Sequence, residues 1–199
     1  MIHSSFFLAD FGPLLVSLGL LYPIAAMIAK VVREKELRQK ELMKMMSVNE
    51  SDIGGSWFVS FALFHFVTAT LATIASTQLF EHSAEYLLWI FWLLTMLALI
   101  VFSMAISAIG SKTSRVVLLG LLLFFTGVFF TIAVESATGD LAIISILSLH
   151  PVSAFLFGIQ KIGRLEDLDL GLVSETLEYP DSISGYTFMM TLRSLGISI

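Results

Sequence analysis

The chain has 199 residues, of which 57% are hydrophobic and only 14% are charged, and its formal net charge is −5. Ordinary globular domains carry about 25% charged residues, so this composition excludes a soluble domain and indicates a membrane protein. The acidic balance argues against nucleic acid as a partner, and the absence of cysteine excludes disulfides and thiol chemistry.

Four apolar stretches are long enough to cross a bilayer as helices. A span needs about 20 mainly apolar residues at a rise of about 1.5 Å each. The stretches that qualify cover residues 6–29, 57–80, 86–109 and 116–134. The sequence therefore predicts an all-α membrane protein, a polytopic helical bundle.

A charged segment, EKELRQKELMKMM at residues 34–46, lies between the first two of these spans. Two i, i+4 pairs with the acid first support a helix there: Glu34 with Arg38, and Glu36 with Lys40. An apolar edge, rich in methionines that adapt to an imperfect partner surface, accompanies them: Leu37, Leu42, Met45 and Met46. We expect an interfacial helix over residues 31–46. It either docks on a partner or lies on the inner leaflet, and charge alternation does not decide between the two.

Polar side chains within the second span fall on one helical face. His65, Thr68 and Ser76 follow the helical repeat. Small residues and hydroxyl groups let transmembrane helices approach closely and bond to one another. An ionisable group inside the membrane is also a candidate functional group. This face therefore fits either helix packing or a substrate path beside His65.

Residues 141–160 are uncharged, but Pro151 interrupts them near the middle. Proline removes a backbone donor, and the residue before it avoids the helical conformation, so we expect two short helices, 141–149 and 152–160. Non-helical backbone at membrane depth needs protein or water to cover it. The pattern predicts a re-entrant helical hairpin that enters from the outer side, with a kinked fifth span as the alternative.

Three acidic residues, Glu166, Asp167 and Asp169, follow this hairpin. They fit a solvated loop face, with cation binding or a general acid as the alternative. The four histidines are scattered without ligand spacing, so the sequence predicts no metal site and no catalytic set. Residues 185–199 begin a last apolar helix that is too short to finish a crossing. We therefore expect the chain to end inside an element, as a fragment would.

Lysine and arginine are retained on the cytoplasmic side of membrane proteins. Six of the eleven lie between the first two spans, and Lys112 and Arg115 lie between the third and the fourth. Residues 30–56 and 110–115 are therefore predicted to be cytoplasmic. The N-terminus of this segment and residues 135–184 are predicted to be outside.

The sequences of three segments resemble the A subfamily of ABC transporters. Residues 34–57, EKE-x-R-x-KE-x-MKMM followed by a polar turn and WF, look like the first cytoplasmic coupling helix of that family. The motifs PV at 151–152, FLFG at 155–158, LED at 165–167 and then Gly171 resemble its outer-leaflet helical hairpin and acidic exit. GYTF at 185–188 resembles the entry to its last transmembrane helix. Ser47 departs from the pattern because it stands where the family usually has glycine, and Gly54 and Gly55 replace bulkier residues.

The resemblance implies a partial transmembrane domain of a type-II exporter fold that moves lipids or other amphipaths outward. The coupling helix would contact a nucleotide-binding domain through Glu34, Arg38, Glu41, Leu42, Met45 and Met46. The outer hairpin would be marked by Pro151, Phe155 and Gly158. The first helix of this half, a large extracellular domain and a second transporter half would complete the assembly.

The chain lacks the G-x-x-x-x-G-K-[ST] phosphate loop, so it is expected to bind no cofactor and to be no enzyme by itself. ATP and Mg would enter through a nucleotide-binding domain that is absent from this chain. The alternative is a stand-alone membrane scaffold or interaction protein that kept the permease fold without its motor.

Overall fold

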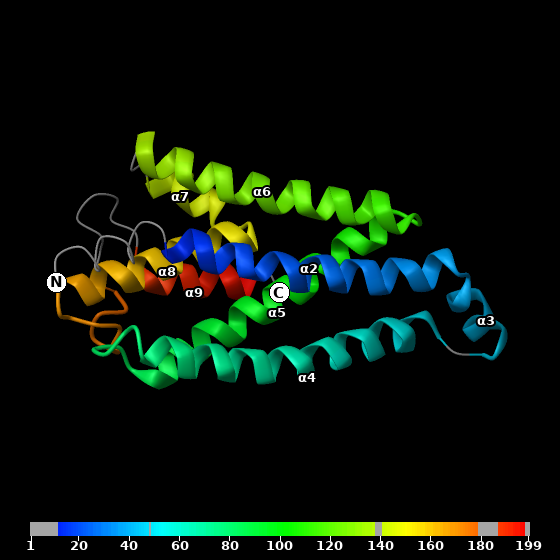
Figure 1. The fold of residues 1–199 in the computed structure, drawn as a ribbon, viewed down its shortest axis with the longest axis horizontal. Helices are drawn as coiled ribbons and strands as arrows, with labels where there is room; N and C mark the ends of the chain where they lie inside the picture. The colour runs from blue at the N-terminus through cyan, green and yellow to red at the C-terminus, as the bar shows by residue number, and fades with distance from the viewer. Residues whose placement is uncertain (1–11, 48, 138–140, 179–186, 198–199) are drawn as a thin grey trace.

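The computed structural model describes residues 12–47, 49–137, 141–178 and 187–197, and every regular element among them is a helix (Figure 1). The helices are α2 (Gly12–Glu36), α3 (Gln39–Met45), α4 (Glu50–Thr77), α5 (Glu85–Ile109), α6 (Thr113–Ala137), α7 (Leu141–Leu147), α8 (Pro151–Asp167) and α9 (Phe188–Ile197). The predicted all-α helical bundle is confirmed.

Helices α2, α4, α5 and α6 are the four in the described part that are long and apolar enough to cross a membrane. Two of them exceed the predicted apolar stretches toward α3, because α2 continues beyond Ala29 to Glu36 and α4 already begins at Glu50. Apolarity marks where a helix is in lipid, whereas the helix itself continues until its backbone bonds end. Residues 6–11 of the first predicted span lie outside the described residues.

Helix α5 lies at the centre of the bundle. It packs against α2, α4, α6, α8 and α9, and one side of its length is buried. Phe91 of α5 stacks on Phe155 of α8, with ring centroids 5.7 Å apart and 12° between the ring planes. Phe188 of α9 meets the same Phe91 ring at 5.6 Å. Because lipid supplies no hydrophobic drive between helices, such close ring contacts supply the packing energy that holds α8 and α9 to the bundle.

Helices α7 and α8 form a hairpin beside α6, and Figure 1 shows the two helices meeting partway along the bundle. The chain turns at residues 148–150, and Pro151 begins α8 at a position where its missing N–H costs no helical bond. The second helix is longer than expected, since α8 continues through Gln160 to Asp167. Whether this hairpin enters the bilayer from the outer side stays a prediction.

The charged segment is not the single helix expected over residues 31–46. Its first part belongs to α2, which ends at Glu36, and its second part is the separate seven-residue helix α3. The backbone turns between them at Arg38, whose φ of 55° lies in the left-handed region. A second left-handed residue, Ser47 with φ 63°, follows α3. Because α2 ends at Glu36, no continuous helix joins Glu34 to Arg38, and the predicted i, i+4 pairing of these two residues loses its basis.

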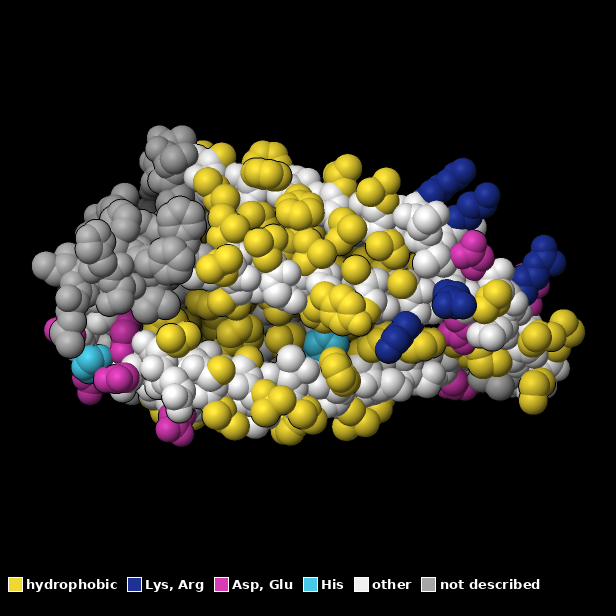
Figure 2. All heavy atoms as spheres, in the orientation of Figure 1, with side chains coloured by type: hydrophobic (Ala, Val, Ile, Leu, Met, Phe, Trp, Pro, Cys, Tyr) yellow, Lys and Arg dark blue, Asp and Glu magenta, His cyan; other side chains and the backbone are white. Residues whose placement is uncertain are grey.

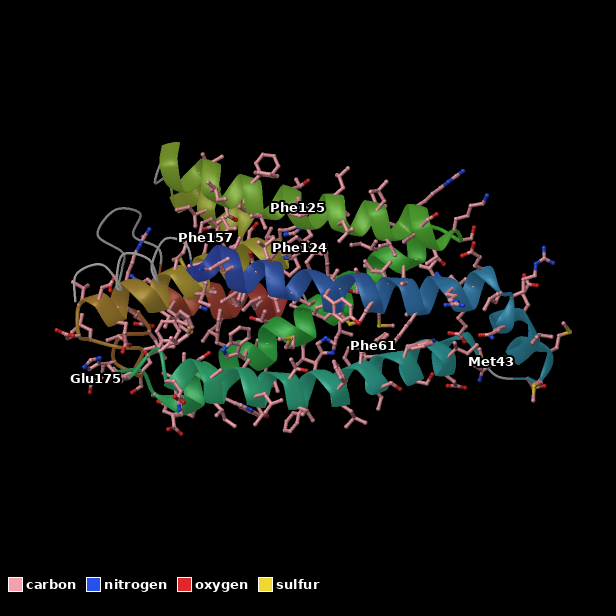
Figure 3. The ribbon with its side chains drawn as sticks, in the orientation of Figure 1. Met43, Phe61, Phe124, Phe125, Phe157 and Glu175 are labelled. Atoms are coloured by element: carbon pink, nitrogen blue, oxygen red, sulfur yellow. The ribbon has the colours of Figure 1, made fainter. Side chains whose placement is uncertain are left out.

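The bundle has two chemically different ends. The α3 end holds α3 and the turn at 110–112, and Figure 2 shows Lys and Arg side chains gathered there on the visible face. The outer end, named for its predicted side, holds the turn at 81–84 and the loop at 168–178. Figure 3 shows Met43 at the first end and Glu175 at the second. The two predicted cytoplasmic segments thus share one end, while the absolute orientation of the bundle stays a prediction.

Candidate functional site

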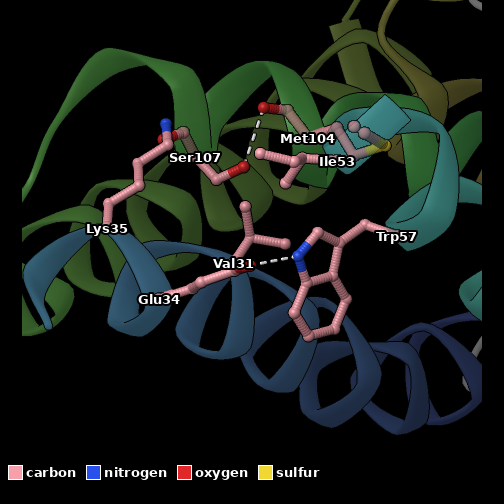
Figure 4. A pocket seen from close by; sticks show the side chains of 8 residues that line it. Val31, Glu34, Lys35, Ile53, Trp57, Met104 and Ser107 are labelled. Atoms are coloured by element: carbon pink, nitrogen blue, oxygen red, sulfur yellow. Dashed lines mark hydrogen bonds between the residues drawn. The ribbon is translucent and has the colours of Figure 1, made fainter. Parts of the chain in front are cut away.

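Charged residues at the end of α2 form hydrogen bonds with neighbouring helices. The indole Nε1 of Trp57 in α4 donates a hydrogen bond to the Glu34 carboxylate, as Figure 4 shows. The Lys35 ammonium donates to the backbone carbonyl of Ser107 in α5 at 2.6 Å. These side chains, with Val31 and residues of α4 and α5, line a small pocket of ≈ 150 Å³. Charge-assisted bonds of this kind are stronger than bonds between neutral groups, so they tie α2 firmly to α4 and α5.

The next residue, Glu36, bonds to the start of α6. Its carboxylate accepts hydrogen bonds from the Thr113 hydroxyl at 2.6 Å and from the Thr113 backbone N–H at 3.2 Å. An acidic group at a helix N-terminus also interacts favourably with the positive end of the helix dipole. Three consecutive residues, 34–36, therefore bond α2 to α4, α5 and α6 directly before the chain enters α3.

Helix α3 and the turn after it present apolar side chains to their surroundings. Leu42 is 58% exposed, and Met45 and Met46 are each 77% exposed. The other predicted contact residues, Arg38 and Glu41, are exposed in the same segment. Glu34 differs from them because it is half-buried against Trp57. We name the exposed set Arg38, Glu41, Leu42, Met45 and Met46 the α3 surface.

A groove runs between α2 and α4, with a volume of ≈ 620 Å³. Figure 2 shows this hollow with a histidine side chain inside it. The α2 side of its lining consists of Gly19, Tyr22, Pro23, Ala26, Met27 and Lys30. The α4 side consists of Trp57, Ser60, Phe61, Phe64, His65 and Thr68. We name it the α2–α4 groove.

The predicted polar face of the second span is divided by the structure. His65 and Thr68 line the α2–α4 groove, whereas Ser76 is buried and accepts a hydrogen bond from the indole of Trp92 in α5 at 2.9 Å. Residues 65 and 76 are eleven positions apart along α4. Ser76 therefore has a packing role, and only the other two residues belong to a candidate substrate path.

The predicted hairpin residues all lie in the core. Pro151 and Phe155 are buried, and Phe155 also contacts Trp92 with ring centroids 5.5 Å apart. A Cβ atom added to Gly158 would come within 2.5 Å of the Phe91 ring and 2.8 Å of the Thr191 methyl group. These residues thus set how closely α8 approaches α5 and α9.

One contact at the outer end could not be inferred from the sequence pattern. The Glu166 carboxylate accepts hydrogen bonds from the His82 backbone N–H at 2.7 Å, from His82 Nδ1 at 3.0 Å and from the Ser83 hydroxyl at 2.9 Å. The Ser83 hydroxyl oxygen in turn accepts from the Leu172 N–H at 2.9 Å. Glu166 therefore joins the exit of α8 to the turn before α5, which we name the outer-turn contact.

Comparison with known proteins supports the same class of molecule. A family described as ABC-2 family transporter protein matches residues 4–199. The glucosylceramide transporter ABCA12 of Homo sapiens is 27% identical over 169 residues, which cover 83% of this chain and 6% of that protein. The cholesterol transporter ABCA5 of Rattus norvegicus is 28% identical over 176 residues, or 84% of this chain and 10% of that protein.

ATP-binding cassette sub-family A member 2 of Homo sapiens is 31% identical over 115 residues, covering 57% of this chain and 5% of that protein. The chain thus spans about a tenth or less of the length of these relatives. The family match covers nearly the whole chain, and four apolar helices of spanning length agree with it. The chain belongs to the ABC-2 family of transporter proteins, as a multi-pass membrane permease domain and not a catalytic ATPase domain.

Proposed function

We propose that this permease domain moves lipids or similar amphipaths outward, driven by ATP hydrolysis in a nucleotide-binding domain outside these 199 residues. Mg and ATP bind in that domain, and a second transporter half completes the passage. The relatives support the substrate class, because one is named for glucosylceramide and another for cholesterol, which are both membrane amphipaths. The α3 end faces the cytoplasm in this proposal.

The observation that carries the proposal is the position of the α3 surface. Exposed methionine and leucine side chains lie on a short helix beyond the ends of α2 and α4, where they add nothing to the bundle core. Methionine adapts to the surface that it meets, which suits a contact that changes during a transport cycle. The α3 surface therefore docks into a nucleotide-binding domain.

The hydrogen bonds of residues 34–36 connect the α3 surface to the membrane-spanning helices α4, α5 and α6. A displacement of α3 reaches the end of α2 through only two intervening residues, 37 and 38. Glu34, Lys35 and Glu36 then hold α4, α5 and α6 to that end. Rigid helices joined by charged hydrogen bonds move together, which is the physical requirement for transmission between two domains.

The test replaces Met45 and Met46 with serine in the full-length transporter reconstituted in liposomes. Loss of the adaptable contacts should cost about 1–2 kcal/mol of docking free energy. We expect normal membrane insertion, at least a fivefold reduction in lipid-stimulated ATPase activity, since about 1 kcal/mol is about a fivefold change, and a matching loss of lipid export. The measurements are phosphate release and the appearance of labelled lipid in the outer leaflet.

The matched control is Leu168→Ser, because Leu168 is 64% exposed at the outer end. This control should keep both stimulation and export. Wild-type stimulation and export in the methionine double variant would remove the docking role and leave α3 as a helix on the leaflet surface.

A further inference from the structure

We propose that the α2–α4 groove binds one phospholipid of the inner leaflet, with its phosphate at Lys30 and an acyl chain along the groove floor. The inference deepens the proposed lipid transport and rests on it for placing the α3 end in the cytoplasm. Lys30 lines the groove at the part of α2 nearest the α3 end, where phosphate groups of the inner leaflet lie.

The length of the groove fits one leaflet. Its lining on α2 runs from Gly19 to Lys30, which is about 16 Å at the helical rise. The hydrocarbon core of a bilayer is about 30 Å thick, so the groove extends through roughly half of it. A volume of ≈ 620 Å³ lies within the range of about 300–1,000 Å³ that small-molecule sites occupy. These dimensions suit a single lipid chain that lies parallel to the helices.

The floor of the groove behaves as an apolar surface despite its polar residues. The Ser60 hydroxyl donates to the Ser56 carbonyl at 2.7 Å, and the Thr68 hydroxyl donates to the Phe64 carbonyl at 3.0 Å. His65 Nδ1 bonds to the Phe61 carbonyl at 2.8 Å, and since a carbonyl only accepts, this nitrogen carries the proton. An acyl chain over these three side chains therefore covers donors that already have hydrogen-bond partners.

Among the described residues that line the groove, Lys30 is the one Lys, Arg, Asp or Glu side chain. It is exposed, and among the residues that the structure describes it has no hydrogen-bond or ion-pair partner. The nearby carboxylate of Glu34 accepts the Trp57 indole N–H and is directed toward α4. An unneutralised ammonium group at the inner end of an apolar groove is complementary to a ligand with an anionic head and an apolar tail. A phospholipid has both parts in this order.

The test uses the full-length transporter in nanodiscs that contain phosphatidylserine with a photoactivatable diazirine on its acyl chain. After illumination, peptide mass spectrometry locates the label. We expect saturable labelling of α2 and α4 that unlabelled phospholipid displaces. Lys30→Gln should raise the half-saturating lipid fraction about fivefold, the effect of about 1 kcal/mol for one lysine near a membrane surface, while Lys30→Arg should leave it unchanged.

Gly19→Leu tests the groove by filling it. No atom lies within 4 Å of a Cβ built on Gly19, so a larger side chain starts in open space at the groove. We expect it to abolish saturable labelling. Gly55→Leu is the matched control, because Gly55 of α4 has equally open surroundings and does not line the groove. The control should keep the wild-type labelling.

Three outcomes would overturn the proposal. The first is labelling that rises linearly with lipid fraction, which marks ordinary bilayer contact. The second is labelling that Gly19→Leu and Lys30→Gln both leave unchanged, and the third is a cross-link from the groove to another protein helix in place of lipid. Lipid export measured on the same variants in liposomes separates this inference from the proposed function. Export without saturable labelling removes only the groove site, whereas saturable labelling without ATP-driven export removes only the transport role.

Discussion

The two ends of the bundle use polar groups in opposite ways. At the outer end, Glu166 accepts three hydrogen bonds from the turn before α5, and this end is closed by contacts within the chain. At the α3 end, the charges of residues 34–36 are bonded internally, but the helix beyond them leaves Met45 and Met46 exposed. In the described residues, the outer end thus has a carboxylate bonded within the chain, while the α3 end leaves apolar side chains exposed.

Left-handed backbone occurs at both ends. At the outer end Gly171, with φ 60°, is a glycine, which adopts this conformation at no steric cost, and Asp169, with φ 56°, belongs to a residue type that is enriched in this region. At the α3 end the left-handed residues are Arg38, with φ 55°, and Ser47, with φ 63°. The α3 end therefore differs in having such residues on both sides of one short helix.

The largest expected effect is the substitution Gly171→Ala. An added Cβ would collide with the backbone carbonyl of His82, and the left-handed φ adds a further penalty. Together these should lower the free energy of unfolding by about 2–5 kcal/mol. Thermal melting of the purified full-length protein in detergent measures the loss. Gly55→Ala is the control, with open space around it in a helix, and it should keep or raise the melting temperature. An unchanged melting temperature in the first variant would show that the outer end is loose.

A smaller effect is expected for Glu166→Gln. The amide keeps the shape of the side chain but removes its charge and one acceptor oxygen, while three donors still face it. Hydrogen bonds to charged groups contribute about 1.5–3 kcal/mol, so a partial loss should cost about 1–2 kcal/mol. Chemical denaturation checks this value against Asp167→Asn, a control at the exposed neighbouring residue that should change stability by less than about 0.5 kcal/mol. Equal effects in both variants would contradict the outer-turn contact.

The smallest effect belongs to Ser47→Gly, and its sign is opposite. Glycine accepts the φ of 63° without the penalty that serine has, so the folded protein should become more stable by about 0.5–1 kcal/mol. The same change at Ser51, within α4, should give no such gain. If Ser47→Gly destabilises the protein, the backbone at this position is not left-handed. A gain in stability with slower transport would indicate that the left-handed serine has a function.

The sequence predicted the spans well because each one is stabilised by a property that its own residues carry. An apolar stretch of lipid length has few alternatives to a helix, so α5 and α6 agree with residues 86–109 and 116–134 within a few positions. Pro151 likewise determines where a helix begins, and the break between α7 and α8 ends at this residue. Properties of this kind are readable without knowledge of distant contacts.

The division of the charged segment at Arg38 could not be read in the same way. The i, i+4 pairs favoured a continuous helix, but Glu34 and Glu36 bond to residues 23 and 77 positions away in the sequence. The contact of Glu166 with Ser83 joins positions 83 apart. One clue was present, because Ser47 stands at the position of a family glycine and proves to be left-handed. Distant pairing leaves no periodic pattern in a single sequence.

The most direct test of the difference between the two ends is site-specific photo-cross-linking in the full-length transporter. The photoreactive residue p-benzoylphenylalanine replaces Met46 in one variant and Leu168 in the other, since both native side chains are exposed. We expect position 46 to cross-link to a nucleotide-binding domain, with a yield that changes when ATP is added, and position 168 to give no such product. Absence of the product at position 46, with and without ATP, would contradict docking through α3.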